Sequence, residues 1–238
     1  MKIIVGCEES QEVCLAFRKL GHEAFSCDLQ HCSGGHPEWH IISDIFKIIE
    51  GGFFNTENGD LHNVWDWDMG IFHPPCTYLT VTANRWLKDQ PKLKSGALVG
   101  EARREARREA TEFFIKLLNV NIQKICLENP VGIINSIVKP TQLIHPYYFG
   151  DEARKATCLW LKNLPPLFHA KEPDLFNNEI THVDEGESVY WIDSKTGKQK
   201  RQPLWYAKAK RGKELGDRSM ERSKTFPGIA TAMAQQWG

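Results

Sequence analysis

The stretch KIIVGCEESQEVCLAFRKLGHEAFSCD, residues 2–28, decides the fold. Its first residues, 2–5, are mostly apolar and β-branched and end at a glycine, which is typical of a buried strand. Apolar side chains then recur at three- and four-residue spacing and predict a helix over residues 10–20, closed by a second glycine. A further strand is expected at 24–27 and leads directly to Asp28. The chain therefore begins with a strand–helix–strand unit.

The turn and the acid of this unit indicate a cofactor site. Asp28 follows Gly6 by 22 positions, a layout in which the acid accepts hydrogen bonds from ribose hydroxyls. The turn Gly6-Cys7-Glu8-Glu9-Ser10 is not G-x-G-x-x-G, and its two glutamates would repel phosphates but tolerate or bind a cation. A third acid, Asp44, lies in a short strand expected at 41–45 and could face the same cofactor.

Length and composition are those of a globular α/β domain with, at most, a small appended module. The chain has 238 residues, 41% hydrophobic and 25% charged, which excludes wholesale disorder. No apolar run approaches the roughly 20 residues needed to cross a membrane. Seven cysteines, an odd number, do not suggest a secreted disulfide scaffold. We therefore expect a reducing, cytoplasmic environment and no membrane partner.

The net charge of zero hides a strong asymmetry along the chain. Residues 195–224 hold eleven Lys/Arg against three Asp/Glu, a balance of 11 − 3 = +8. Four aromatic residues accompany this basic tract: Tyr190, Trp191, Trp205 and Tyr206. Cations interleaved with aromatic rings are typical of nucleic-acid contacts. A solvated loop is the alternative interpretation.

A cysteine follows the apolar stretch Ile71-Phe72-His73-Pro74-Pro75-Cys76. Two prolines end the expected strand, because they lack a backbone donor. The residues after Cys76 suit the start of a helix. Unpaired backbone N–H groups at such a corner would favour a thiolate and so a nucleophile. The alternative is a buried, inert cysteine.

A carboxyl group follows the next expected strand in the same way. Residues 122–127 are apolar and end at Glu128-Asn129-Pro130. Cys76 and Glu128 thus follow consecutive strands, at the sheet edge where ligands bind in open α/β sheets. A carboxyl group with a raised pKa beside a nucleophilic cysteine could donate a proton. Helix capping or an ion pair is the alternative role for Glu128.

Two further patterns leave alternatives open. The repeat EARREARR, residues 101–108, predicts an amphipathic helix with i, i+4 ion pairs, and contact of its arginines with phosphate is the alternative. Five potential zinc ligands lie close together in the sequence, but their spacing matches no paired zinc signature, so a histidine-rich surface loop is the alternative. These residues are Cys27, His31, Cys32, His36 and His40.

With Pro74-Pro75-Cys76 and Glu128-Asn129 in place, the chain resembles the DNA (cytosine-5) methyltransferases, and most closely their small phage- and prophage-type members. The resemblance covers nearly the whole chain. Further segments are similar to the family's cofactor motifs, to its arginine-containing strand and to its C-terminal helix, namely Gly6 with Asp28 and Asp44, Arg154 to Leu161, and Arg222 to Gly238 with its TFPGIA core.

The resemblance implies a Rossmann-like fold for S-adenosylmethionine-dependent methyl transfer, with a mostly parallel sheet and helices on both faces. It implies catalytic roles for four residues, with Cys76 adding to cytosine C6, Glu128 assisting at N3, and Asn129 and Arg154 holding the base or the loop. It implies cofactor contacts from Gly6, Glu8, Asp28, Asp44 and Pro74, and no metal. The expected partner is DNA, either duplex with a flipped base or single-stranded.

The chain also departs from the family pattern. Its first motif keeps only Gly6, and His73 stands where glycine is usual. We expect a catalytic domain at 1–168, a short basic insertion at 169–221 in place of a target-recognition domain, and a returning helix at 222–238. Two alternatives remain, a pyrimidine-modifying enzyme that acts on RNA or a nucleotide with another cofactor, and a catalytically silent DNA-binding relative.

Overall fold

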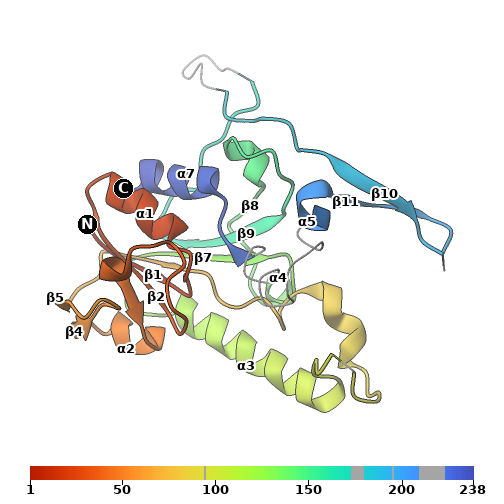
Figure 1. Cartoon of the computed structure of the whole chain (residues 1–238), viewed down its shortest axis with the longest axis horizontal. Helices are drawn as coiled ribbons and strands as arrows, with labels where there is room; N and C mark the ends of the chain where they lie inside the picture. Colours follow the sequence, from red (N-terminus) through yellow and green to blue (C-terminus); the bar gives the residue numbers. More distant parts are fainter. Residues whose placement is uncertain (94, 173–179, 195, 209–222) are drawn as a thin grey trace.

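A computed structural model describes residues 1–93, 95–172, 180–194, 196–208 and 223–238. Within these residues a seven-stranded sheet forms the centre of the molecule (Figure 1). Strand β9 runs antiparallel to both of its neighbours, and the other strands pair in parallel. In spatial order the strands are β3 (His40–Ile42), β2 (Glu23–Asp28), β1 (Lys2–Gly6), β6 (Met69–Phe72), β7 (Lys124–Pro130), β9 (Thr157–Lys162) and β8 (Gln142–Ile144).

Both faces of this sheet are buried, because successive strand residues point to opposite sides. Ile3 and Val5 pack into one apolar cluster with helices α1 (Glu12–Lys19) and α7 (Pro227–Trp237), and Ile4 packs into the other. The second cluster includes residues of α2 (Ile45–Ile49) and α3 (Gly100–Leu118). Figure 1 shows α1 and α7 above the sheet and α3 below it. Strands that are buried on both faces are continuous apolar runs in the sequence, and this is why they could be predicted from it.

The predicted fold class is confirmed. The structure has a mostly parallel sheet with helices on both faces, and one reversed strand lies next to the sheet edge. This is the strand arrangement of Rossmann-like methyltransferases. Of the expected elements, the first two strands, the helix at 101–117 and the terminal helix agree with the structure to within a few residues.

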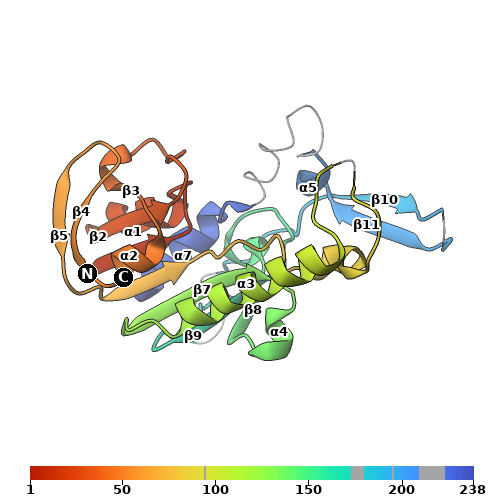
Figure 2. The same ribbon diagram turned by 90° about the horizontal axis from the view of Figure 1, so that it is seen from below.

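The remaining elements are short. They are the 3-10 helices η1 (Pro37–Trp39), η2 (Val81–Leu87) and η3 (Pro146–Phe149), the helices α4 (Ile134–Ile137) and α5 (Leu204–Lys208), and two hairpins, β4 (Gly52–Asn55) with β5 (Leu61–Val64) and β10 (Ser188–Ile192) with β11 (Gln199–Pro203). Both views show β10 and β11 projecting from one end of the molecule (Figures 1 and 2).

Three local expectations are wrong. The strand expected at 41–45 ends at Ile42, and Asp44 instead caps α2, accepting a hydrogen bond from the Phe46 amide at 3.0 Å. The glycine, asparagine, aspartate and histidine residues of segment 51–63 predict a loop, but this segment forms most of the β4–β5 hairpin. Strand β7 continues through Pro130, because its last residues pair with β9.

The proposed division into domains stays a prediction. The hairpin β10–β11 and helix α5 lie within 169–221, and α7 packs against α1 of the amino-terminal segment. Part of the basic tract, including Lys210, Arg211 and Lys213, lies outside the described residues, as does Arg222. None of the described helices is long and apolar enough to cross a membrane.

Gly228, in the first turn of α7, should be intolerant of a side chain. A Cβ there would lie 2.0 Å from the Phe149 carbonyl oxygen and 2.6 Å from the Asp151 carboxylate, which accepts the Gly228 amide. We expect Gly228→Ala to lower the free energy of unfolding by about 2 kcal/mol or more, as overpacking does. Denaturant titration measures this. Gln235→Ala, exposed on the same helix, is the control and should change it by less than about 0.5 kcal/mol; equal effects would contradict the prediction.

Candidate active site

The strand order reverses direction beside β1, which pairs with β2 on one side and β6 on the other. At such a switch point the loops after the two strands diverge and leave a crevice where ligands bind. A hydrogen bond joins the first residues after β1 and β6, because the His73 amide donates to the Gly6 carbonyl at 2.9 Å. Gly6 has no room for a side chain, since a Cβ would lie 2.7 Å from Phe72 and 2.8 Å from Ile45.

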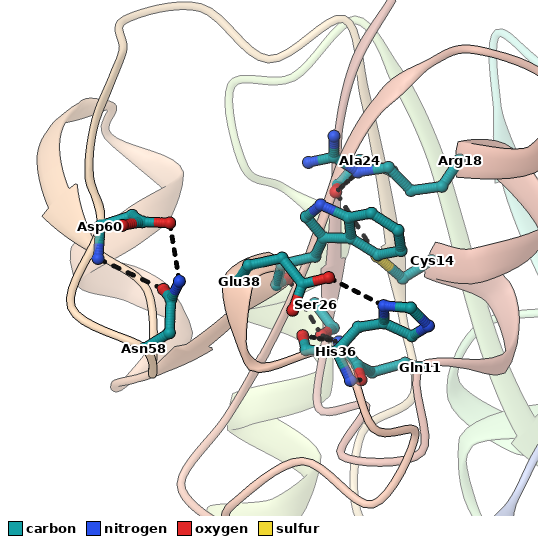
Figure 3. A network of polar contacts seen from close by, with 10 residues as sticks. Gln11, Cys14, Arg18, Ala24, Ser26, His36, Glu38, Asn58 and Asp60 are labelled. Atoms are coloured by element: carbon teal, nitrogen blue, oxygen red, sulfur yellow. Dashed lines mark hydrogen bonds and ion pairs between the residues drawn. The ribbon is translucent and has the colours of Figure 1, made fainter.

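The turn after β1 adopts left-handed backbone conformations without glycine. Cys7 has φ 59° and Gln11 has φ 62°, conformations that cost energy for residues with a Cβ. Side-chain contacts hold the second of these in place (Figure 3). The Gln11 amide donates to the Ser26 hydroxyl at 3.2 Å and to the His36 carbonyl at 2.9 Å, and its oxygen accepts from the His36 amide. The glycine-poor motif therefore still makes a tight turn.

Glu8 lies within this turn and is buried, with 3% of its surface exposed. Its carboxylate accepts hydrogen bonds from the Val13 amide at 2.7 Å and the Cys14 amide at 3.2 Å, at the start of α1. Burial raises the pKa of Glu8 to about 7, against the lowering effect of His73 and of these two amides. The carboxylate that the sequence assigned to a cofactor thus also stabilises the first turn of a helix.

The other two predicted acids meet at the same edge. Burial is the main cause that raises the pKa of Cys7 to about 12, and the charges of Asp28 and Asp44 add to it. Leu29 is 76% exposed and Ile42, paired with Asp28 in the sheet register, is 42% exposed. Carboxylates accept hydroxyl hydrogen bonds and exposed apolar side chains cover a flat ring. This set of residues therefore fits a nucleoside.

The second half of the site follows β6 and β7. His73 Nδ1 lies 2.9 Å from the Glu128 carboxylate, and both side chains are almost fully buried. Thr225, which precedes α7, lowers the pKa of Glu128, and its hydroxyl lies 3.4 Å from His73 Nδ1. Burial raises the pKa of Glu128, but Lys155, His73 and Thr225 outweigh it, so the pKa is lower than usual. Glu128 is therefore ionised at neutral pH.

Cys76 is partly buried and electrostatically coupled to Glu128. Burial is the largest influence on its pKa and raises it; Glu128 acts in the same sense and Lys155 opposes them. The thiol is therefore the resting form. This corrects the expectation of a thiolate stabilised by a helix N-terminus. The chain after Cys76 first makes a turn, in which the Cys76 carbonyl accepts from Leu79 and Thr80, and then the 3-10 helix η2.

The structure brings Lys155, not Arg154, to this site. Arg154 lies 3.7 Å from Glu185, which also pairs with Arg201. Lys155 lowers the pKa of both Cys76 and Glu128, and its amine donates to the Lys224 carbonyl at 3.5 Å. Arg154, which the resemblance assigned to holding the base or the loop, is thus engaged by Glu185, and Lys155 is the cation that acts on Cys76 and Glu128.

Asn129 connects β7 to the loop that carries Cys76. Its amide nitrogen donates to the Pro74 carbonyl at 2.7 Å, and the side chain is buried. The Asn129 amide oxygen has no hydrogen-bond partner within the described part of the chain. Pro74 is itself buried next to His73. Asn129 therefore holds the loop at the position of Pro74.

Two arginines of α3 hold the loop beyond Cys76. Buried Arg103 donates to the Thr77 carbonyl at 3.2 Å, and Arg107 donates to the Tyr78 carbonyl at 2.8 Å and to Asn84 at 2.8 Å. The second arginine of each EARR repeat pairs with the glutamate three positions before it, Arg104 with Glu101 and Arg108 with Glu105, and not at the expected i, i+4 spacing. Arg108 also pairs with Glu112, which does have that spacing. One face of the repeat thus supports the loop and the other pairs its own charges.

The five potential zinc ligands are engaged separately. Buried His40 contacts the Ser26 hydroxyl and the Gln30 carbonyl, His31 and the Cys32 amide contact Glu57, His36 stacks on Trp39, and Cys27 contacts the Ser43 carbonyl. In the described ranges no group of three or more metal-binding side chains could hold an ion.

Sequence reasoning missed Lys155, Arg103 and Arg107 as site residues, and noted His73 only as a departure. The four-residue spacing of the two arginines was the available signal, since it places them on one helix face. No signal in the sequence favours Lys155 over the adjacent Arg154, which belongs to the segment that resembles the family's arginine-containing strand.

Comparison with known proteins adds little on function. No protein-family model and no curated protein matches the chain. Among solved structures, the chain is similar to a crystal structure described as a "putative DNA modification methyltransferase encoded within prophage" of E. coli, with 12% sequence identity and a TM-score of 0.40. The match covers 83% of this chain and 62% of that one. We draw no argument on activity from a likeness at this level.

Replacing the guanidinium group of Arg107 should increase the mobility of the loop after Cys76, because Arg107 donates hydrogen bonds to Tyr78 and Asn84. Arg107→Lys keeps the charge but cannot make the same set of hydrogen bonds, each worth about 1 kcal/mol. We expect amide hydrogen exchange at residues 77–84 to speed up about five- to tenfold. Arg108→Lys, one position along and paired with Glu105 and Glu112, is the matched control. Unchanged exchange in Arg107→Lys, or the same increase in both variants, would contradict this role.

Proposed function

We propose that the protein transfers a methyl group from S-adenosylmethionine to C5 of cytosine in DNA, through a covalent bond from Cys76 to C6. The observation that supports this most is the grouping of Cys76, Glu128 and Lys155 beside the Cys7, Asp28 and Asp44 edge. A nucleophile, an acid and a cation adjoin a set of residues that fits a nucleoside. Both groups follow strands on either side of the point where the strand order reverses, which is where ligands bind in open α/β sheets.

The residues at the β1–β2 edge fit the proposed cofactor. Asp28 and Asp44 would accept hydrogen bonds from its adenosine part, with exposed Leu29 and Ile42 beside them. Gly6 and Pro74 would line the crevice between the two loops, and the buried Glu8 carboxylate would favour a cation. When bound, S-adenosylmethionine supplies an electrophilic methyl group on a positively charged sulfur.

The chain's residues divide the chemistry among them. Cys76 Sγ, after losing its proton to solvent, adds to C6 and places carbanion character on C5. Glu128 assists protonation at N3 and so stabilises the developing charge, while Lys155 favours the thiolate. Once C5 is methylated, loss of its proton to a base allows Cys76 to leave as a thiolate. Asn129 holds the Cys76 loop throughout by its bond to Pro74.

DNA is the proposed polymer partner. Exposed Tyr190 and Trp191 lie on the projecting hairpin, opposite Arg201 and Lys200 in its register. Aromatic and cationic side chains on a two-stranded ribbon suit stacking on bases or entry into a major groove. The exposed aromatic side chains favour a polymer over a free nucleotide.

Covalent trapping tests the proposed reaction. Fluorine at C5 cannot leave as a proton does, so DNA containing 5-fluorocytosine should remain attached to Cys76 once a methyl group has been transferred. We expect an adduct by denaturing electrophoresis and mass spectrometry only when S-adenosylmethionine is present. Cys76→Ser should abolish it, and Cys32→Ser, outside the site, should not. Absence of an adduct with folded, cofactor-bound wild-type protein on single- and double-stranded DNA would refute the cytosine reaction.

Calorimetry with S-adenosylhomocysteine tests the cofactor separately. If Asp28 accepts ribose hydroxyl hydrogen bonds, Asp28→Ala should weaken binding by about tenfold or more, since hydrogen bonds to a charged group contribute about 1.5–3 kcal/mol. Asp66→Ala, an exposed acid near the opposite end of the parallel strands, is the control and should bind like the wild type. A flat titration with the wild-type protein would favour the alternative of a different cofactor.

A further inference from the structure

His73 occupies an unusual position, between two buried carboxylates. Its Nδ1 lies 2.9 Å from Glu128, with side-chain exposures of 9% for His73 and 7% for Glu128. Glu8, from the turn after β1, acts on the ring electrostatically, and Lys155 acts in the opposite sense. The neutral groups nearby are Thr225 and the Cys76 thiol, the latter coupled to Glu128 and Lys155.

Protonation of His73 gives the buried Glu128 carboxylate a cationic partner. Burial lowers the pKa of His73, but the hydrogen bond to Glu128 and the charges of Glu128 and Glu8 outweigh it, so the pKa is raised. The pKa of Glu128 is lowered, since Lys155, His73 and Thr225 overcome its burial. Glu128 then faces two cations, His73 and Lys155, and is not left as an unpaired buried charge.

This arrangement conflicts with the simplest role for Glu128. The proposed reaction needs a carboxyl group that donates a proton to N3, yet Glu128 is ionised at rest. The proton lies on the adjoining ring nitrogen instead, in a hydrogen bond of ordinary length. A carboxylate that touches both the ring and the base can pass that proton on.

We propose that His73 and Glu128 share one proton, which His73 holds at rest and Glu128 transfers to N3 of the base. This rests on the proposed function. As Cys76 adds to C6, the proton on His73 Nδ1 moves to the Glu128 carboxylate and from there to N3, which leaves His73 neutral and Glu128 ionised again. When Cys76 departs, N3 returns the proton by the same route. No oxidant or further reactant is needed, and His73 is a positioning residue, because it acts through Glu128.

The pH dependence follows from the sign of the two shifts. His73 holds its proton at low pH and loses it as pH rises through its raised pKa, so delivery to N3 fails on the alkaline side. Cys76 loses its proton more readily as pH rises, so the rate first increases. The wild-type rate of adduct formation with 5-fluorocytosine DNA should therefore be bell-shaped in pH.

His73→Asn is the test variant, because it keeps an N–H donor near the Nδ1 position but cannot release a proton. We expect the rate of adduct formation to fall about 100-fold, within the usual range for acid–base catalysis. The alkaline limb should also move to lower pH, since Glu128 alone must then hold the proton. His22→Asn, which precedes β2 at the opposite end of the parallel strands, should keep the wild-type rate and profile. A rate loss in His73→Asn with an unchanged profile would reduce His73 to a structural residue and overturn the proposal.

Histidine nitrogen NMR tests the shared proton without any activity. In the wild-type protein the His73 signals should remain those of the charged ring to a higher pH than those of His22. In Glu128→Gln the titration of His73 should move to lower pH, because its hydrogen-bonding anion is gone. If His73 titrates like an exposed histidine in both proteins, the shared proton is refuted, whether or not adducts form. If wild-type protein forms no adduct but the NMR shifts occur, the cytosine reaction fails and the proton pair remains.

Discussion

The parallel pairing of β1 with β6 is the constraint on which both halves of the site depend. Gly6 is aligned with Phe72 in the sheet register, so the chain leaves both strands at the same level. The His73 amide then extends the pairing by one further bond to Gly6. From that point one loop turns toward β2 and the other toward β7. The acids of the first half and the thiol of the second are consequently brought to one edge by the sheet, before any side chain contact is considered.

Charge compensation then decides how the second half is arranged. Glu8 and Glu128 are buried acids, and either alone would cost several kcal/mol without a partner. His73 offsets both, and Lys155 adds a second positive charge. His73 stands where the family that the sequence resembles has a glycine, and it interacts electrostatically with Glu8 in the turn after β1. The departures at Glu8 and at His73 compensate one another, which explains why the chain can carry both.

The sequence was sufficient for the sheet but not for all side-chain positions. Strands buried on two faces have apolar runs, so Cys76 could be placed after β6 and Glu128 at the end of the apolar run of β7, although β7 itself continues through Pro130. The β4–β5 hairpin could not be anticipated, because its polar and glycine residues resemble those of a loop. Arg154 and Lys155 show the limit most clearly. Neighbouring residues in an extended segment point to opposite sides, so a difference of one position decides which cation reaches the site, and only tertiary packing settles it.

The resting protonation of the site is the opposite of what a nucleophilic attack requires. Burial keeps Cys76 as a thiol, and the same surroundings keep Glu128 ionised. A thiol is less readily oxidised than a thiolate, so this arrangement protects the cysteine while no ligand is present. In the proposed reaction, activation would accompany entry of the base, when an acceptor at N3 would draw the proton out of the His73–Glu128 pair. While Glu128 carries that proton, its charge no longer raises the pKa of Cys76, and Lys155 still favours the thiolate. Protonation at N3 and formation of the nucleophile would then be coupled through a single carboxylate.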